Sequence, residues 1–280
     1  MIIEKSNLDF YKENGFLISS YFLSENEIDQ IKKMISNFLP NKIDCFYYSL
    51  IGNSFKGNIQ IKEILLPYFE KVCSQIFISD TQFITPSFLI KPKRTSETLL
   101  LHQDWSYVDE RVEFSATVWI SLIDTNENNG GLFVLPKSHL LFNNFRSGSL
   151  LTGRISFENS SFLKNHIKRI DLKKGQVFIF NPSLFHGSFP NNSLEDRIAI
   201  TAIAMPSKTK LLHVVKDTNE NIAKSYSISE DDFFKNLLNL SHANYDSLVQ
   251  NEKDCFYYEH QNIDLELLTN KYKKLIEDLQ

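Results

Sequence analysis

The sequence carries at positions 197–204 the run Arg197-Ile198-Ala199-Ile200-Thr201-Ala202-Ile203-Ala204, which is apolar except for its first residue and one threonine. Its isoleucines give it the β-branched character that is typical of a buried strand. Further short runs, apolar or alternating, occur earlier in the chain between turn residues, at 82–90, 98–103, 114–122, 131–135, 168–172 and 176–180. Together with the strand predicted at 197–205, these segments predict an antiparallel sandwich or barrel.

Helical patterns flank this β core on both sides. Ser24 and Glu27 have the spacing of a capping box, and apolar residues then recur at helical spacing, which predicts a helix over 24–39. Similar stripes predict helices at 59–78, where Pro67 should kink or split the helix, and at 263–279. Ser229-Glu230-Asp231-Asp232 can cap a further helix, over 229–240. The expected fold class is mainly β with flanking helices (α+β). We expect one domain over 1–280, with a helical segment 1–80, a β-barrel core 81–206 and a helical C-terminal extension 207–280.

Composition narrows the class of protein. The chain has 280 residues, of which 42% are hydrophobic and 23% charged, and these values exclude a disordered or low-complexity chain. Lys and Arg number 30 against 34 Asp and Glu, so the net charge of -4 argues against nucleic acid as a partner. The three cysteines are too few and too widely spaced for a disulfide framework. No apolar run is long enough to cross a membrane and the chain starts with polar residues, which predicts a soluble, cytoplasmic protein.

A histidine and an aspartate stand two positions apart where the run 98–103 ends, in Leu99-Leu100-Leu101-His102-Gln103-Asp104. Side chains two apart on a strand point to the same face, so His102 and Asp104 can converge on one metal ion. His186 follows the run 176–180 in an aromatic, nearly uncharged segment. Each histidine also has a plainer interpretation, as a solvated surface residue or as a hydrogen-bonded core residue. Two histidines and one carboxylate nevertheless make up the facial triad that holds non-haem Fe(II) and leaves coordination positions open.

Arg197 opens the apolar run 197–204. An unpaired buried charge is costly, so a guanidinium at this place needs an anionic partner or water. Its planar fork suits a carboxylate held by two parallel hydrogen bonds. An arginine that reaches solvent at the end of its strand is the open alternative.

Several motifs together resemble one known family. They are His102-Gln103-Asp104, Val118-Trp119-Ile120-Ser121-Leu122, the stretch from Asn128 to His139, and His186 with Ser188 and Arg197. In type, order and spacing they resemble the phytanoyl-CoA dioxygenase (PhyH-like) family of Fe(II)- and 2-oxoglutarate-dependent oxygenases, over residues 8–206. The resemblance implies a double-stranded β-helix, a cupin-like jelly-roll barrel with helices packed on one side.

The resemblance also implies roles for the matching residues. His102, Asp104 and His186 are implied to bind iron. Arg197 is implied to bind the distal carboxylate of 2-oxoglutarate, with Ser188 as a second contact to the same carboxylate.

Two more residues belong to the implied cosubstrate pocket. Trp119 is implied to line it, and Thr201, on the same strand face as Arg197, is a further candidate. Many 2-oxoglutarate enzymes carry a serine at the position of Ala199. This chain departs from that pattern, because alanine has no hydroxyl to make the second contact.

The implied activity is a dioxygenase that uses Fe(II), 2-oxoglutarate and O₂, with ascorbate as a possible aid, and releases succinate and CO₂. Because Asp104 keeps its carboxylate, where halogenating members have a small residue, hydroxylation of an unactivated C–H bond is favoured over halogenation. The expected substrate is a small molecule, with a biosynthetic or specialised-metabolite intermediate as one candidate. A non-catalytic metal or small-molecule binding protein on the same barrel, and a protein or peptide hydroxylase, are the alternatives. The oligomeric state is not predicted.

Candidate substrate residues follow from position. Trp105 and Tyr107 come directly after the ligand pair, and Arg146 and Arg154 lie in the long segment 140–165, where a lid would be expected. Packing is the alternative for the tryptophan, and solvated surface charge is the alternative for each arginine.

Overall fold

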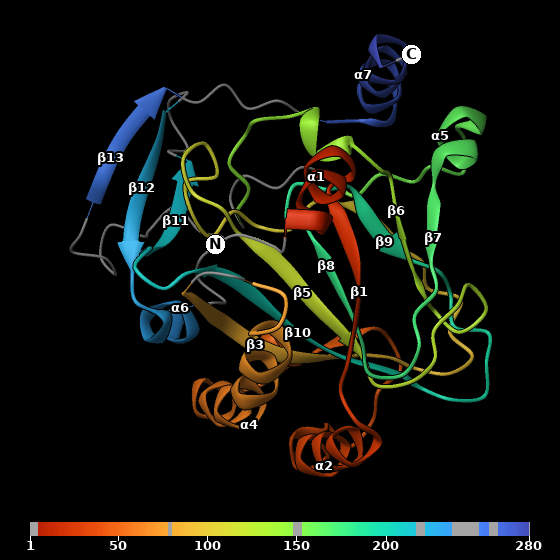
Figure 1. The fold of residues 1–280 in the computed structure, drawn as a ribbon, viewed down its shortest axis with the longest axis vertical. Helices are drawn as coiled ribbons and strands as arrows, with labels where there is room; N and C mark the ends of the chain where they lie inside the picture. The colour runs from red at the N-terminus through yellow and green to blue at the C-terminus, as the bar shows by residue number, and fades with distance from the viewer. Residues whose placement is uncertain are drawn as a thin grey trace.

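Two antiparallel sheets form the centre of the computed structural model, which describes residues 5–77, 80–147, 153–216, 222–236, 252–257 and 263–279 (Figure 1). The larger sheet has six strands in the order β1 (Phe16–Phe22), β8 (Gln176–Phe180), β5 (Ala116–Ser121), β10 (Arg197–Pro206), β3 (Thr81–Lys91) and β2 (Tyr47–Tyr48). The smaller has four, in the order β4 (Leu99–His102), β9 (His186–Ser188), β6 (Leu132–Val134) and β7 (Lys168–Ile170). The strands predicted between 82 and 205 are therefore confirmed.

The large sheet is buried on both faces, which explains why its strands are almost wholly apolar. On the inner face, Trp119 and Phe178 lie side by side and pack with Val134 of the small sheet. On the outer face, Val118 and Ile200 belong to a cluster that includes side chains of two helices, α2 (Glu25–Ile35) and α4 (Phe55–Cys73). Along each strand, side chains therefore point alternately into the barrel and toward the helices that cover the outer face.

The predicted helices of the N-terminal segment are present. The one expected over 24–39 is α2 followed by the 3-10 turn η1 (Ser36–Phe38), and the one expected over 59–78 is α4. α4 remains one helix through Pro67, so the predicted split does not occur. This segment also contains α1 (Lys5–Asn14) and the short α3 (Ser49–Gly52). A further short helix, α5 (Ser161–His166), directly precedes β7.

The capping box at the start of α2 forms as predicted, with the Ser24 hydroxyl accepting from the Glu27 amide and the Glu27 carboxylate accepting from the Ser24 amide. Replacing Ser24 with alanine is expected to lower the free energy of unfolding by about 1 kcal/mol, because the Glu27 amide loses its acceptor and the Glu27 carboxylate loses the hydroxyl that donates to it. Urea denaturation measures this loss. Ser36→Ala at the other end of α2 is the control, where only an exposed side-chain bond to the Lys33 carbonyl disappears; an equal loss in both variants would contradict the prediction.

The prediction of a helical segment 1–80 is wrong for two stretches. Residues 16–22 form β1, which pairs with β8 and places Phe16 opposite Phe180. Residues 47–48 form β2, which pairs with β3. Both are edge strands whose hydrogen-bond partners lie far away in the sequence, so local periodicity does not indicate them.

The prediction of a helical extension 207–280 is also wrong in part. Three strands, β11 (Leu211–Lys216), β12 (Ile222–Ile228) and β13 (Glu252–Tyr257), form a separate antiparallel sheet. The predicted helices at 229–240 and 263–279 correspond to α6 (Glu230–Asn236) and α7 (Leu265–Asp278), and residues 237–240 lie outside the described residues. Apolar and β-branched side chains in 211–215 favour a strand over a helix.

The extension packs against the barrel beside the segment that follows β4. Phe233 of α6 and Leu211 of β11 share a buried cluster with Tyr107 and Val108. The Leu212 amide donates to the Tyr107 carbonyl at 2.8 Å. No helix within the described ranges has both the length and the apolar composition that a bilayer crossing requires.

Candidate metal centre

The small sheet brings the three predicted metal ligands together. β4 and β9 are neighbours, and His102 lies directly opposite His186 in their register. Asp104 follows β4 by two residues, and its Oδ1 lies 3.6 Å from the His186 Nε2. One ligand atom from each of the three side chains lies within 4.8 Å of the other two. This spacing suits three ligands on one face of a single divalent ion.

Backbone carbonyls fix which nitrogen of each imidazole faces the centre. The Nδ1 of His102 lies 2.8 Å from the Leu100 carbonyl, and the Nδ1 of His186 lies 2.9 Å from the Leu184 carbonyl. A carbonyl can only accept, so each Nδ1 carries the proton and each Nε2 has its lone pair free for a metal. Burial, reinforced by the neighbouring His186, lowers the pKa of His102 to about 4. His102 is therefore neutral near pH 7, as a metal ligand must be.

A hydroxyl orients the third ligand. Thr117 on β5 donates to the Asp104 Oδ2 at 2.7 Å, which leaves Oδ1 toward His186. Sequence reasoning did not single out Thr117. Its position in the sequence offered a signal, because Thr117 stands two residues before Trp119 and residues two apart on a strand share a face. Thr117 could therefore have been placed on the inner face with Trp119.

Arg197 is buried at the start of β10 on the inner face of the large sheet. Arg197 is 1% exposed, and its Nε and Nη1 have no hydrogen-bond partner among the described residues. The guanidinium carbon lies 5.5 Å from the Trp119 ring centre and 5.9 Å from that of Phe46. Burial lowers the pKa of Arg197 to about 10, so the group stays charged at neutral pH. A buried charge with unused donors indicates a place for an anion.

Ser188 adds a second unused polar group. It stands two residues after His186 on β9, is fully buried, and its Oγ has no partner in the described part of the chain. Buried hydroxyls in folded proteins almost always have a hydrogen-bond partner. A bound molecule that accepts from this hydroxyl would complete the site.

A second buried cation, which sequence reasoning missed, lies next to Arg197. Lys91 ends β3 directly opposite Arg197. Its ammonium group donates to three backbone carbonyls, those of Glu97, Ser188 and Phe189. Burial, and then the charge of Arg197, lower the pKa of Lys91 to about 7. The signal in the sequence was a lysine that directly follows the apolar run 82–90.

Two other expected cosubstrate residues share the inner face of the large sheet. Trp119 is 3% exposed and lies opposite Thr201. The Thr201 hydroxyl donates to the Val118 carbonyl at 3.0 Å, so its proton is used within the sheet. Ala199 lies opposite Ser121, whose hydroxyl donates to the Ile123 carbonyl.

The candidate substrate residues have different surroundings. Trp105 is half-buried, with its ring centre 6.2 Å from that of His213 and 6.3 Å from that of Phe233, both in the extension. Tyr107 is buried, and burial raises its pKa well above the usual range, so the phenol keeps its proton. Arg154 is exposed and close enough for its charge to help lower the pKa of His102.

Arg146 is buried, and its three side-chain nitrogens donate four hydrogen bonds to protein acceptors. The expected lid in 140–165 is interrupted by residues 148–152, which lie outside the described residues.

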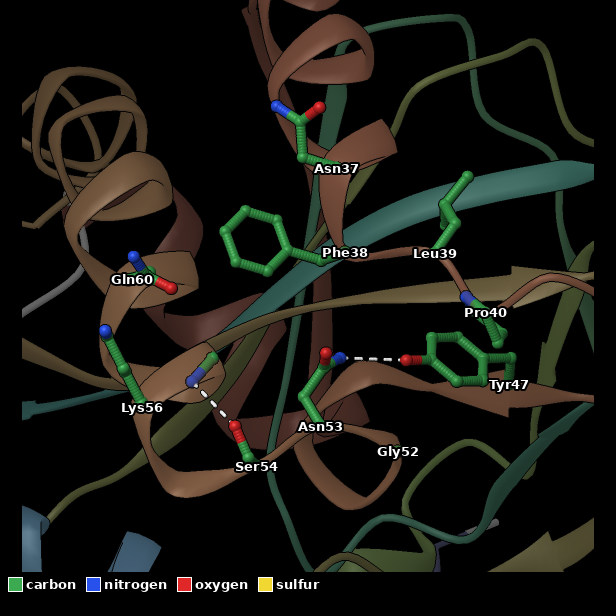
Figure 2. Close-up of a pocket in the computed structure, with 11 residues that line it drawn as sticks. Asn37, Phe38, Leu39, Pro40, Tyr47, Gly52, Asn53, Ser54, Lys56 and Gln60 are labelled. Carbon is green, nitrogen blue, oxygen red and sulfur yellow. Dashed lines mark hydrogen bonds between the residues drawn. The ribbon is translucent and has the colours of Figure 1, made fainter.

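A hollow of about 400 Å³ opens elsewhere on the molecule, where α4 begins (Figure 2). Asn53 lies between the two sides of this hollow and donates to the Tyr47 hydroxyl. Tyr47 lies opposite Ile90, which packs on the helix side of the sheet. None of the three candidate metal ligands lines this hollow.

The family model Phytanoyl-CoA dioxygenase (PhyH) matches residues 11–199, which include the three candidate ligands, Ser188 and Arg197. The chain belongs to the phytanoyl-CoA dioxygenase family. The match ends inside β10, so the sheet β11-β12-β13 and α6 lie beyond the part that the family model describes.

Curated relatives carry the same family name. A Dictyostelium discoideum protein described as a phytanoyl-CoA dioxygenase is 29% identical over 93 residues, which cover 32% of this chain and 27% of that protein. The peroxisomal phytanoyl-CoA dioxygenase of Bos taurus is 25% identical over 249 residues, covering 77% of this chain and 72% of the relative.

Solved structures share the fold. HygX from Streptomyces hygroscopicus with iron bound has 14% identity and a TM-score of 0.52, over 74% of this chain and 88% of that one. SnoK, a non-heme alpha ketoglutarate dependent carbocyclase from nogalamycin biosynthesis, has 17% identity and a TM-score of 0.51, over 75% of this chain and 86% of that one. The expected jelly-roll fold of this family is therefore confirmed.

Proposed function

We propose that this protein is an Fe(II)- and 2-oxoglutarate-dependent dioxygenase that hydroxylates a C–H bond of a small molecule. One observation carries the proposal: a cluster of two histidines and an aspartate stands on the same barrel as a buried arginine with unused donors. Fe(II) prefers the first group of side chains, and a carboxylate fits the second. A protein that only bound a metal would have no need for the unpaired guanidinium.

Each residue has a stated part in this proposal. His102, Asp104 and His186 hold the iron through Nε2, a carboxylate oxygen and Nε2, and leave three coordination positions open. Arg197 and Ser188 bind the distal carboxylate of 2-oxoglutarate with the donors that have no protein partner. Bound Fe(II), together with 2-oxoglutarate and O₂, supplies the oxidation that inserts oxygen into the substrate and releases succinate and CO₂.

The surrounding side chains restrict access to this centre. Trp119 lies on the large-sheet side, and its ring centre is 5.5 Å from the Arg197 guanidinium carbon, within the range of a cation–π contact. Thr201 lies beside it, with its hydroxyl directed to the backbone. These groups exclude water from the cosubstrate, which strengthens its ionic contacts.

A small-molecule substrate is supported by Trp105, which directly follows Asp104 and is half-buried, and by the exposed Arg154, whose charge acts on His102. Among proteins with this fold, HygX has been crystallised with nickel, 2-oxoglutarate and hygromycin B bound.

Purified protein supplied with Fe(II), ascorbate and 2-oxoglutarate is expected to release succinate slowly, and faster when a substrate from a metabolite panel is added. Succinate is quantified by mass spectrometry, with the metal-chelated protein as the control. Succinate at the chelated level with every metabolite would contradict the proposal. Under that outcome, tight metal binding without turnover would indicate a binding protein, and turnover only with peptides would indicate a peptide hydroxylase.

A further inference from the structure

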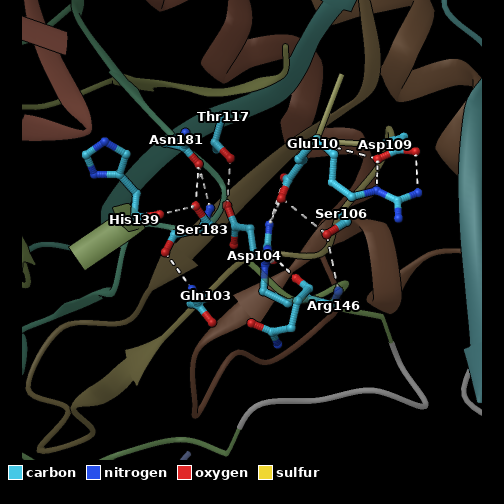
Figure 3. A network of polar contacts seen from close by, with 12 residues as sticks. Gln103, Asp104, Ser106, Asp109, Glu110, Thr117, His139, Arg146, Asn181 and Ser183 are labelled. Atoms are coloured by element: carbon cyan, nitrogen blue, oxygen red, sulfur yellow. Dashed lines mark hydrogen bonds and ion pairs between the residues drawn. The ribbon is translucent and has the colours of Figure 1, made fainter. Parts of the chain in front are cut away.

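The backbone of Asp104 is held from both sides. Its amide donates to the Pro182 carbonyl at 2.8 Å, and its carbonyl accepts from the Arg146 Nε at 2.8 Å. Figure 3 shows Arg146 between Asp104 and Glu110, with its guanidinium turned toward both. The carboxylate of Asp104 therefore extends from a main chain that is fixed at its amide and at its carbonyl.

Arg146 is itself held by an ion pair with Glu110, whose side chain is 20% exposed. The side chain of Arg146 is 2% exposed, and its Nη2 donates to both carboxylate oxygens of Glu110, at 2.7 and 2.6 Å. The Nη1 donates to the Asn144 carbonyl at 2.9 Å. Charge-assisted bonds of this length are among the stronger ones in proteins.

Backbone bonds brace the same two segments. The Ser106 amide donates to the Arg146 carbonyl at 2.8 Å, and the Arg146 amide donates to the Ser106 hydroxyl at 3.2 Å. The next residue, Ser147, donates from its hydroxyl to the Val214 carbonyl of β11. The segment after β4 is thus joined through Arg146 to a strand of the extension, which lies beyond the part matched by the family model.

We propose that Arg146 and Glu110 are positioning residues that hold the Asp104 carboxylate in the orientation for metal binding. This inference rests on the proposed function and replaces the substrate contact expected for Arg146 from the sequence. The physical reason is that a ligand must be held within a fraction of an ångström of its bonding position, and Asp104 follows the last residue of β4 by two positions, so the strand ladder does not fix it. The Arg146 bond adds a constraint at the Asp104 carbonyl to those that the Pro182 carbonyl and the Thr117 hydroxyl already supply.

Metal titration tests this proposal without any turnover. Arg146→Lys keeps the positive charge but cannot donate to Asp104 and both Glu110 oxygens together, and Glu110→Gln keeps the shape but removes the charge. Each is expected to weaken Co(II) binding about 10- to 100-fold, the usual effect of losing a group that orients a metal ligand. Calorimetry of the cosubstrate-free protein gives the affinity, and the Co(II) absorption spectrum reports the coordination geometry, which is expected to change.

The adjacent ion pair supplies matched controls. Arg111 donates twice to the Asp109 carboxylate in the same segment, and this pair is more exposed to solvent than the side chain of Arg146. Asp109→Asn and Arg111→Lys are expected to keep the wild-type affinity and spectrum. Thermal unfolding of every variant without metal separates a loss of folding from a loss of positioning, and Glu110→Gln serves if Arg146→Lys does not fold.

Two results would overturn the inference. Unchanged Co(II) affinity and spectrum in a folded Arg146→Lys or Glu110→Gln variant would show that the pair does not position Asp104. A raised KM for substrate with unchanged metal affinity would restore the substrate role. Failure of the proposed function has a different signature, because Asp104→Ala would then leave the wild-type Co(II) affinity intact.

Discussion

Replacing His186 with alanine is expected to abolish 2-oxoglutarate turnover and to weaken metal binding by more than about 100-fold. Losing a group that merely orients a ligand already costs about 10- to 100-fold in metal affinity, so losing a ligand should cost more. Only His102 and Asp104 would remain of the candidate cluster. Co(II) titration gives the affinity, and succinate release gives the turnover.

The fold must survive for this result to be informative. His186 is 6% exposed and its ring centre lies 4.5 Å from that of Phe180, so alanine leaves a small cavity. His186→Gln, which fills more of the space, is the second variant and is expected to show the same loss. His166→Ala is the matched control, since that histidine lies on α5 and its Nδ1 donates to the Phe162 carbonyl, away from the candidate cluster. Wild-type metal affinity in a folded His186 variant would remove this residue from the centre.

Replacing Arg197 with alanine is expected to weaken 2-oxoglutarate binding by about 2–5 kcal/mol, the usual cost of truncating one partner of a buried charge pair. At about 1.4 kcal/mol for each tenfold change, this corresponds to a loss of about 30- to 4,000-fold. Metal affinity should change little, because Arg197 is not part of the ligand cluster. Titration of 2-oxoglutarate into Mn(II)-loaded protein measures the effect.

Two further variants sharpen this test. Arg197→Lys keeps a charge but loses the planar fork, so an intermediate loss is expected. Arg169→Ala removes an exposed arginine that pairs with Glu127 on the surface and should leave the affinity unchanged. If both Arg197 variants bound 2-oxoglutarate as tightly as the wild type does, the buried guanidinium would not be the cosubstrate's partner.

Much of the barrel could be predicted from local pattern. The run that became β10 is apolar because the sheet is covered on both faces, and the same property makes it recognisable in the sequence. β1 and β9 lack such a signal. β9 is three residues long, and it is a strand because β4 and β6 lie on either side of it.

In the C-terminal extension, the helices could be predicted from the sequence and the strands were missed. Its helices α6 and α7 begin with side-chain caps or acidic residues that are visible in the sequence. The prediction of a helical extension rests on these two helices and is wrong for β11, β12 and β13, which pair with one another as strands.

Arg146 illustrates what a residue's neighbours in sequence cannot reveal. An arginine in a long polar segment is usually solvated, and a position near the site suggests a substrate contact. The structure instead buries it against Glu110 and the Asp104 carbonyl, which lie 36 and 42 positions earlier in the chain. Burial and partners are properties of the folded chain, so the role of such a residue follows only from three-dimensional contacts.

By itself, the sequence determined the family and the strands that are buried on both faces. It also identified the residues with metal-binding chemistry, because side-chain type and spacing along a strand are local properties. The tertiary structure alone decided that His102 and His186 stand opposite each other, which imidazole nitrogen faces the centre, and which buried donors stay unused. Those features depend on the register between strands far apart in the chain and on the exclusion of water, and neither is encoded in any short stretch of residues.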